Sequence, residues 1–214
     1  MTQRTHRAAA GGFTLIELLI GFAIMAVLLV LAAPSFTSMI ETQRLRGTND
    51  QLTTDIQFMR AEAVSRQEVT GISFGENASM TCYVVHTCGT VTGDDCYCDC
   101  TQSSPTTRCL SPRREVKVVQ LPRASKVEVK SVRVGTAALV ANHVMINPAT
   151  GAMEIFYPIP LTPVPTPTVT EFWAETSLSA TANTAGALQT RVNLLGRPNV
   201  CAPGGVVKGP VACP

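Results

Sequence analysis

Glu17 is the residue whose surroundings most constrain the chemistry of this 214-residue chain. It is the one charged residue in the apolar run 13–33. Inserting an ionised carboxylate into hydrocarbon costs roughly 2.5–3.5 kcal/mol, so Glu17 is expected to have a cationic partner. The simpler alternative is a carboxylate that snorkels to the surface at the end of a membrane anchor.

The apolar run is long enough to cross a bilayer. As a helix it would span about 30 Å, and Arg4, His6 and Arg7 ahead of it predict a cytoplasmic N-terminus. The rest of the chain would then lie outside the cytoplasm. A cleaved secretory signal is disfavoured, because its apolar region is normally shorter and a cut after Ala33 would place Pro34 directly behind the scissile bond.

The eight cysteines all follow the apolar run, in the compartment where disulfides persist. They are Cys82, Cys88, Cys96, Cys98, Cys100 and Cys109, followed by Cys201 and Cys213. Members of a C-x-C run rarely bridge one another, so Cys96, Cys98 and Cys100 are expected to pair with the other three of the first group, in an order the sequence leaves open. Cys201 and Cys213 are expected to close a C-terminal loop. A thiolate metal site is disfavoured by the missing C-x-x-C spacing and the oxidising location.

The sequence offers no catalytic constellation. The three histidines, His6, His86 and His143, have no plausible nucleophile partner in sequence, and no phosphate loop or dinucleotide fingerprint is present. We therefore expect a protein that is not an enzyme and that needs no metal or cofactor.

A long helix is expected to carry Glu17, with a membrane-spanning half over 13–34 and an amphipathic half over 35–66. Pro34 should bend this helix without ending it, and Gly47 is a weak point within it. Apolar residues recur at helical spacing on one face: Leu45, Leu52, Ile56, Met59 and Ala63. Polar residues, including Gln57 and Arg60, fill the other side.

Residues 67–214 are expected to form a β-rich domain. The strand-like runs are 70–74, 82–86, 116–121, 126–134, 144–147, 152–157, 168–176 and 188–195. A bulge is expected at Ser131, where the alternation changes phase, and a hairpin turn at 148–151. Residues 82–109 are expected to contribute a cysteine-rich loop and residues 201–213 a C-terminal loop. The proline-rich tract 157–168 is expected to form an extended surface connection. The predicted fold class is α+β, a long N-terminal helix packed on a disulfide-rich antiparallel sheet domain.

The first 40 or so residues resemble the type III signal of type IV pilins and type II secretion pseudopilins. A short basic leader, 1–12, ends in Gly12 and is followed by Phe13, then Glu17 and a long apolar helix. The resemblance implies that prepilin peptidase cuts after Gly12 and methylates Phe13. It also implies a bacterial inner-membrane protein with a periplasmic domain, assembled by an inner-membrane platform with other pilins or pseudopilins into a helical filament. The new Phe13 amine, in the same chain or a neighbouring one, would be the cationic partner of Glu17.

The stretch "VNLLGRPNVCAP" is similar to the GspH/FimT family of minor pilins and minor pseudopilins. Some FimT-type members carry a Gly-Arg-x-Arg element implicated in DNA binding. Gly196 and Arg197 match its first half, but Asn199 stands in the place of the second arginine.

Charge gives only weak support for nucleic-acid binding. Removal of the leader leaves 15 basic and 15 acidic side chains, so the mature chain is neutral. Residues 108–133 carry a net charge of +6, which we interpret as a solvated strand face balanced by the acidic cysteine loop. The candidate DNA contacts are Arg197, Arg113, Arg114 and Lys117, and little DNA binding is expected. Two alternatives to a filament subunit are a DNA-capturing minor pilin and a solitary membrane-anchored periplasmic domain.

Overall fold

The computed structural model describes residues 13–89, 96–134, 139–141, 143–156, 171–178, 186–193, 195–203, 207 and 209–213. For some of these residues, including 32–35 and 131–134, it describes the backbone alone. The chain divides into two compact units, Met1–Ile40 and Glu41–Pro214. The proline-rich tract 157–168 lies outside the described residues, so the prediction of an extended connection stays a prediction.

Helix α1 runs from Leu15 to Arg66. The predicted helix, over 13–66, is confirmed to within two residues. In the first unit its apolar side chains are exposed, for example Val30 at 73 % and Leu31 at 70 %. Among the described residues no unbroken helix is long and apolar enough to cross a membrane; Leu15–Leu31 and Phe36–Arg66, which meet at a bend, satisfy length and composition only when taken together.

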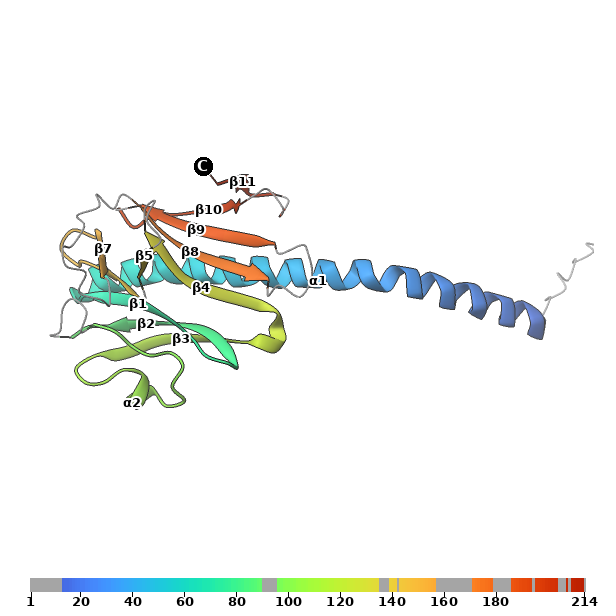
Figure 1. The fold of residues 1–214 in the computed structure, drawn as a ribbon, viewed down its shortest axis with the longest axis horizontal. Coiled ribbons are helices and arrows are strands. Elements are labelled where there is room, and N and C mark those ends of the chain that lie inside the picture. The colour runs from blue at the N-terminus through green and yellow to red at the C-terminus, as the bar shows by residue number, and fades with distance from the viewer. Residues whose placement is uncertain are drawn as a thin grey trace, which may run out of the picture. The chain divides into compact units, whose positions relative to one another are not determined.

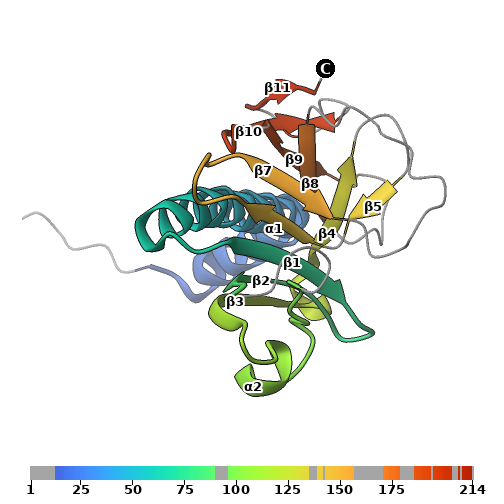
Figure 2. The ribbon, with the colours of Figure 1, turned by 90° about the vertical axis from the view of Figure 1, so that its left-hand side faces the viewer.

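In the second unit, the predicted apolar face of α1 is the face that packs on the domain. All five predicted core residues, Leu45, Leu52, Ile56, Met59 and Ala63, are fully buried. Four of them belong to the main hydrophobic cluster, which also takes in residues from both β-sheets. Residues 41–66 are therefore the central element of the globular core (Figures 1 and 2).

The strands form two sheets. The first has the order β3-β2-β1-β6-β7 and the second β11-β10-β9-β8-β4-β5. The strands of the first sheet are β1 (Thr70–Glu76), β2 (Met80–Thr87), β3 (Arg114–Pro122), β6 (His143–Ile146) and β7 (Met153–Phe156). Those of the second are β4 (Val127–Val134), β5 (Leu139–Ala141), β8 (Glu171–Leu178), β9 (Ala187–Asn193), β10 (Pro198–Ala202) and β11 (Val211–Ala212).

This architecture confirms the predicted α+β class and refines it. The domain contains two sheets where one was expected, and β10 and β11 pair in parallel. The predicted irregularity at Ser131 is present as a shift in the β4–β8 register between Lys130 and Arg133. The predicted hairpin joins β6 to β7, and Gly151 in its turn has φ +64°, a conformation that favours glycine. The short elements β5, β10, β11 and α2 (Pro105–Arg108) were not predicted.

Four disulfides cross-link the second unit. They are Cys82–Cys100, Cys88–Cys96, Cys98–Cys109 and Cys201–Cys213. Each cysteine of the C-x-C run thus pairs outward, as the sequence indicated, and the structure supplies the order. The three bridges of the first group fasten the segment after β2, which includes α2, to β2 and to itself.

Candidate functional sites

The first turn of α1 holds Glu17. Thr14 lies just before the helix, and its carbonyl oxygen accepts hydrogen bonds from the amides of Glu17 at 3.1 Å and Leu18 at 3.2 Å. The Thr14 hydroxyl oxygen also accepts from the Glu17 amide at 3.3 Å. Thr14 and Glu17 therefore occupy the Thr-x-x-Glu positions of a capping box, in which the glutamate can reach back to the amide of the N-cap residue.

An apolar hollow of about 270 Å³ adjoins this turn. Phe13, Leu18, Gly21, Phe22 and Met25 line it together with Glu17. Phe13 is 81 % exposed. The site thus presents one carboxylate beside a surface that water solvates poorly, which suits contact with lipid or with another apolar helix.

The basic segment, residues 108–133, makes contacts within the domain. Lys117 on β3 donates to Asp55 of α1 at 2.5 Å, and the Asp55 side chain is only 4 % exposed. Tyr83 donates to the other oxygen of that carboxylate at 2.9 Å. Burial, reinforced by the Asp55 charge, raises the pKa of Tyr83, so its hydroxyl stays protonated as a donor. The ammonium group of Lys117 thus joins helix and sheet, and its role as a DNA contact stays a prediction.

Other cations of the segment are also engaged. Arg113 donates to the carbonyl oxygens of Tyr97 at 2.5 Å and Leu110 at 3.0 Å, and Arg114 lies 3.8 Å from Glu68. The remaining ion pairs are Arg108–Glu115, Arg123–Glu76, Arg123–Glu128, Lys126–Glu41 and Lys130–Glu128. Glu115 and Glu128 are already counted in the net charge of +6. The carboxylates from outside the segment that offset it are Glu41 and Asp55 of α1, Glu68, and Glu76 of β1. Asp94 and Asp95, which were expected to balance it, lie outside the described residues.

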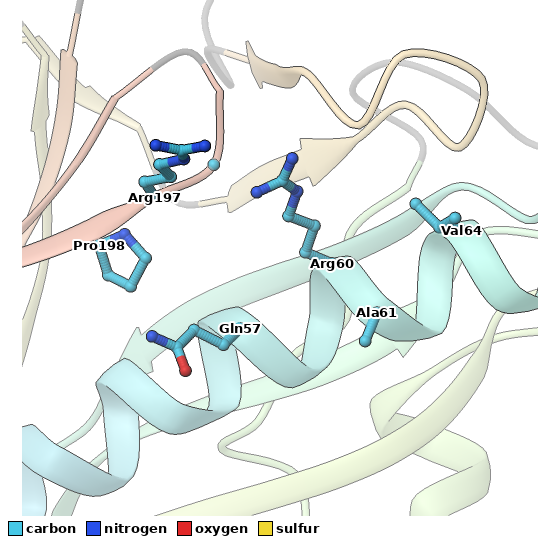
Figure 3. A pocket seen from close by; sticks show the side chains of 7 residues that line it. Gln57, Arg60, Ala61, Val64, Arg197 and Pro198 are labelled. Carbon is cyan, nitrogen blue, oxygen red and sulfur yellow. The ribbon is translucent and has the colours of Figure 1, made fainter.

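Arg197 lies in a different setting, on a groove of the second unit. A pocket of about 540 Å³ opens between α1 and the turn before β10 (Figure 3). Its lining comprises Gln57, Arg60, Ala61 and Val64 from the helix, with Gly196, Arg197 and Pro198 from the turn. The side chains of Arg60 and Arg197 approach the space between the two elements from opposite sides (Figure 3).

The Gly-Arg element has a local physical explanation. Gly196 has φ +72°, and a Cβ at this position would lie 3.3 Å from Cδ of Arg60. Gly151 also has a positive φ, and a Cβ there would lie 3.5 Å from Nε of Arg60. Two turns, one from each sheet, therefore approach the same arginine, and glycine permits both the backbone conformation and the close contact. Arg60 had been predicted only as part of the solvated helix face.

His86 and its neighbouring cysteines form the one group in the described chain with metal-ligand spacing. The ligand atoms of His86, Cys88 and Cys96 lie within 4.8 Å of one another. The two sulfur atoms are bonded to each other, so neither supplies the thiolate that a metal would require. Nε2 of His86 lies 2.7 Å from the Ser73 hydroxyl, and burial lowers the pKa of His86 to about 3. A neutral, buried histidine in a disulfide-linked core fits a structural role.

The N-terminal region matches the family model described as the prokaryotic N-terminal methylation motif, over residues 7–33. The match includes Gly12, Phe13 and Glu17. The N-terminal region is therefore type IV pilin-like, and type IV pilins are structural subunits rather than enzymes. The motif also indicates membrane anchoring through the N-terminal helix.

Among solved structures, the chain is similar to the crystal structure of the type IV minor pilin FimU from Pseudomonas aeruginosa (strain PAO1). The identity is 14 % and the TM-score 0.44, and the alignment covers 78 % of this chain and 97 % of that one. No curated protein matches the chain.

Proposed function

We propose that the chain is a minor pilin or minor pseudopilin of the GspH/FimT type, a structural subunit of a type IV pilus or a type II secretion pseudopilus. Prepilin peptidase removes residues 1–12 and methylates Phe13, and residues 13–34 hold the subunit in the bacterial inner membrane. The N-terminus faces the cytoplasm and the disulfide-rich domain the periplasm. The assembly platform then inserts the subunit into a filament of pilins or pseudopilins. The observation that carries this proposal is the methylation motif over 7–33, with Glu17 placed one turn beyond the cut.

The proposed role of Glu17 follows from electrostatics at the helix start. Cleavage creates an ammonium group on Phe13, directly before the N-cap Thr14. A positive charge there is disfavoured by the partial positive charge of the helix N-terminus. A carboxylate in the first turn offsets both charges, within one subunit before assembly and between neighbours in the filament.

The capping box offers a competing explanation that the test must separate. Glutamine at position 17 keeps the capping geometry, because it can still accept a hydrogen bond from the N-cap amide, but it lacks the charge. We expect Glu17→Gln and Glu17→Ala to reduce incorporation into sheared filaments to a similar extent, and at least about tenfold for an ion pair worth 1.4 kcal/mol or more. Thr14→Ala, which weakens the cap and keeps the charge, should assemble normally.

The measurement is the amount of each variant in sheared filaments, relative to its amount in the membrane fraction. Membrane insertion should be unchanged or improved in both Glu17 variants, because a costly charge has been removed. If Glu17→Gln assembles like the unsubstituted protein while Glu17→Ala does not, Glu17 acts as a helix cap and the proposed pairing is wrong.

The alternative of a DNA-capturing pilin receives less support from the domain. DNA binding depends on many phosphate contacts, and Arg113, Arg114 and Lys117 already have partners within the protein. Among the four candidate contacts, Arg197 is the one whose side chain has neither a hydrogen bond nor an ion pair to a described residue, whereas Arg113 donates to two carbonyl oxygens. The solitary-anchor alternative predicts that Gly12 is not processed.

A further inference from the structure

Arg60 and Arg197 form an unusual pair, because they are cations facing the same groove without a carboxylate between them. None of the seven residues that line the groove is acidic. Neither guanidinium group makes a hydrogen bond or an ion pair with any described part of the chain, in contrast to Arg108 and Arg123. Arg60 is half-buried and Arg197 exposed, so an anion entering the groove could reach both.

The fold holds Arg60 in position. Glycine turns of both sheets close on its side chain, with Gly196 nearest Cδ and Gly151 beside the guanidinium group. A guanidinium group confined in this way loses less conformational freedom when an anion binds than a free surface arginine does. Its planar donors suit the two oxygens of a carboxylate or phosphate.

We propose that this groove binds a carboxylate side chain of a neighbouring filament subunit, presented next to an apolar residue. The apolar component is suggested by Ala61, Pro198 and Val64, the last of which is 46 % exposed. Gln57 contributes an amide at the opposite end from Val64 (Figure 3). The groove thus offers two cations, one amide and an apolar wall, which together complement an acidic peptide segment.

DNA is the weaker fit to the same groove. Two arginines supply about two phosphate contacts, whereas proteins that bind DNA tightly make roughly six to ten. Much of the remaining basic segment is paired with carboxylates. The apolar wall adds to the binding of a peptide and contributes little to the binding of a phosphate chain.

The identity of the partner as a filament subunit rests on the proposed function, but the chemistry of the groove does not. The first test therefore uses the full-length chain in detergent and requires no filament. The probe is a fluorescein-labelled peptide with a central Leu-Glu-Leu, and its matched control carries Leu-Gln-Leu. Fluorescence anisotropy at low salt should show at least about tenfold tighter binding of the glutamate peptide, because charge-assisted hydrogen bonds are about twice as strong as neutral ones.

Variants of the chain locate the binding. Arg197→Ala and Arg60→Lys should each weaken binding of the glutamate peptide about tenfold; the first removes an exposed cation, and the second keeps the charge but loses the planar fork. Arg44→Ala removes an exposed cation from the same helix outside the groove, and should leave binding unchanged. Equal binding of the two peptides, or an equal loss in Arg44→Ala, would overturn the proposal. Binding of duplex DNA without binding of the glutamate peptide would also overturn it.

A second test identifies the partner. A photo-crosslinking amino acid in place of Val64, at the rim of the groove, should form an adduct with a pilin-like subunit in cells, identified by mass spectrometry. Combining it with Arg197→Glu should remove the adduct. If the subunit enters filaments and no such adduct forms, the proposed partner is wrong while the proposed function stands. If the peptide binds but the chain never enters filaments, the proposed function and the filament partner are wrong, while the binding of a carboxylate by the groove stands.

Discussion

At the residue scale, the buried carboxylate of Asp55 is the charge that most needs partners within the protein. It accepts hydrogen bonds from the Lys117 ammonium group and from the Tyr83 hydroxyl. Loss of Lys117 would leave this buried charge with one neutral donor. We expect Lys117→Ala to lower the free energy of unfolding by about 2 kcal/mol, within the range for hydrogen bonds to charged groups. Thermal and chemical unfolding of the full-length chain in detergent measure this.

The matched control is Lys126→Ala. Lys126 also pairs with a carboxylate of α1, Glu41, but that ion pair is exposed: the two side chains are 57 % and 31 % accessible. Exposed pairs contribute about 0–1 kcal/mol, so this variant should remain close to the unsubstituted protein. Equal losses in the two variants would contradict the assignment of Lys117 as a structural residue.

A second residue-scale prediction concerns His86 and pH. Burial, followed by the charges of His143 and Arg113, lowers its pKa from 6.5 to about 3. Between these values the unfolded chain binds a proton that the native protein does not, so the free energy of unfolding falls as pH falls. The slope due to this group is at most about 1.4 kcal/mol per pH unit; it is about half of that at pH 6.5 and nearly vanishes by about pH 7.5.

The measurement is the free energy of unfolding between pH 7.5 and 5. His86→Gln cannot titrate and should show a shallower decline than the unsubstituted protein over the acidic part of this range. The free energy of unfolding of His86→Gln at pH 7.5 is expected to differ from that of the unsubstituted protein for another reason, the lost contact with Ser73. The test therefore compares the slopes with pH and not the values at one pH. Parallel pH profiles for the two proteins would show that His86 does not carry this dependence.

At the element scale, the amphipathic half of α1 contains a glycine that lowers the stability of the helix. Gly47 is exposed within the helix, and a Cβ there would meet nothing within 4 Å. Gly47→Ala should therefore raise the free energy of unfolding by about 1 kcal/mol, since it removes the entropy cost of glycine in a helix. Gly71→Ala serves as the opposite case, because its Cβ would lie 2.8 Å from Cε1 of His86 and should destabilise the protein. Unfolding curves that place the two variants on the same side of the unsubstituted protein would contradict this account.

The elements also show which parts of the structure could be predicted from the sequence. The helix limits, its buried face and eight strands followed from local periodicity, which depends only on neighbours along the chain. The short strands β5 and β11 were missed because two or three residues carry no measurable alternation. Strand β10 begins at Pro198, a residue that argued against a strand.

Among the candidate sites, those formed by residues close together in the sequence could be predicted, and those formed by residues far apart could not. Glu17 was identified because a charge in an apolar run is a local anomaly, and the Thr-x-x-Glu signal of the cap at Thr14 was present but overlooked. The Lys117–Asp55 pair and the Arg60–Arg197 groove join α1 to strands or turns far along the chain, and one sequence holds no information on such pairings. The basic segment was for that reason considered as a DNA contact, although its partners lie within the domain.

At the scale of the whole molecule, the proposed function assigns a different task to each of the two units. The first unit presents an apolar helix with one carboxylate, and the second carries a domain with four disulfides. This division suits a subunit that is held and assembled through one end while the other end stays folded outside the cytoplasm. Removal of the leader is the event on which this account depends, because it creates the charge that Glu17 is proposed to meet.

The most direct test is the intact mass of the protein purified from membranes of cells that contain prepilin peptidase. The account predicts a chain of residues 13–214 with one methyl group on the Phe13 amine. Coexpression without the peptidase should leave the leader in place and serves as the control. A chain that retains residues 1–12 when the peptidase is present, or one that begins at Pro34, would contradict the central claim.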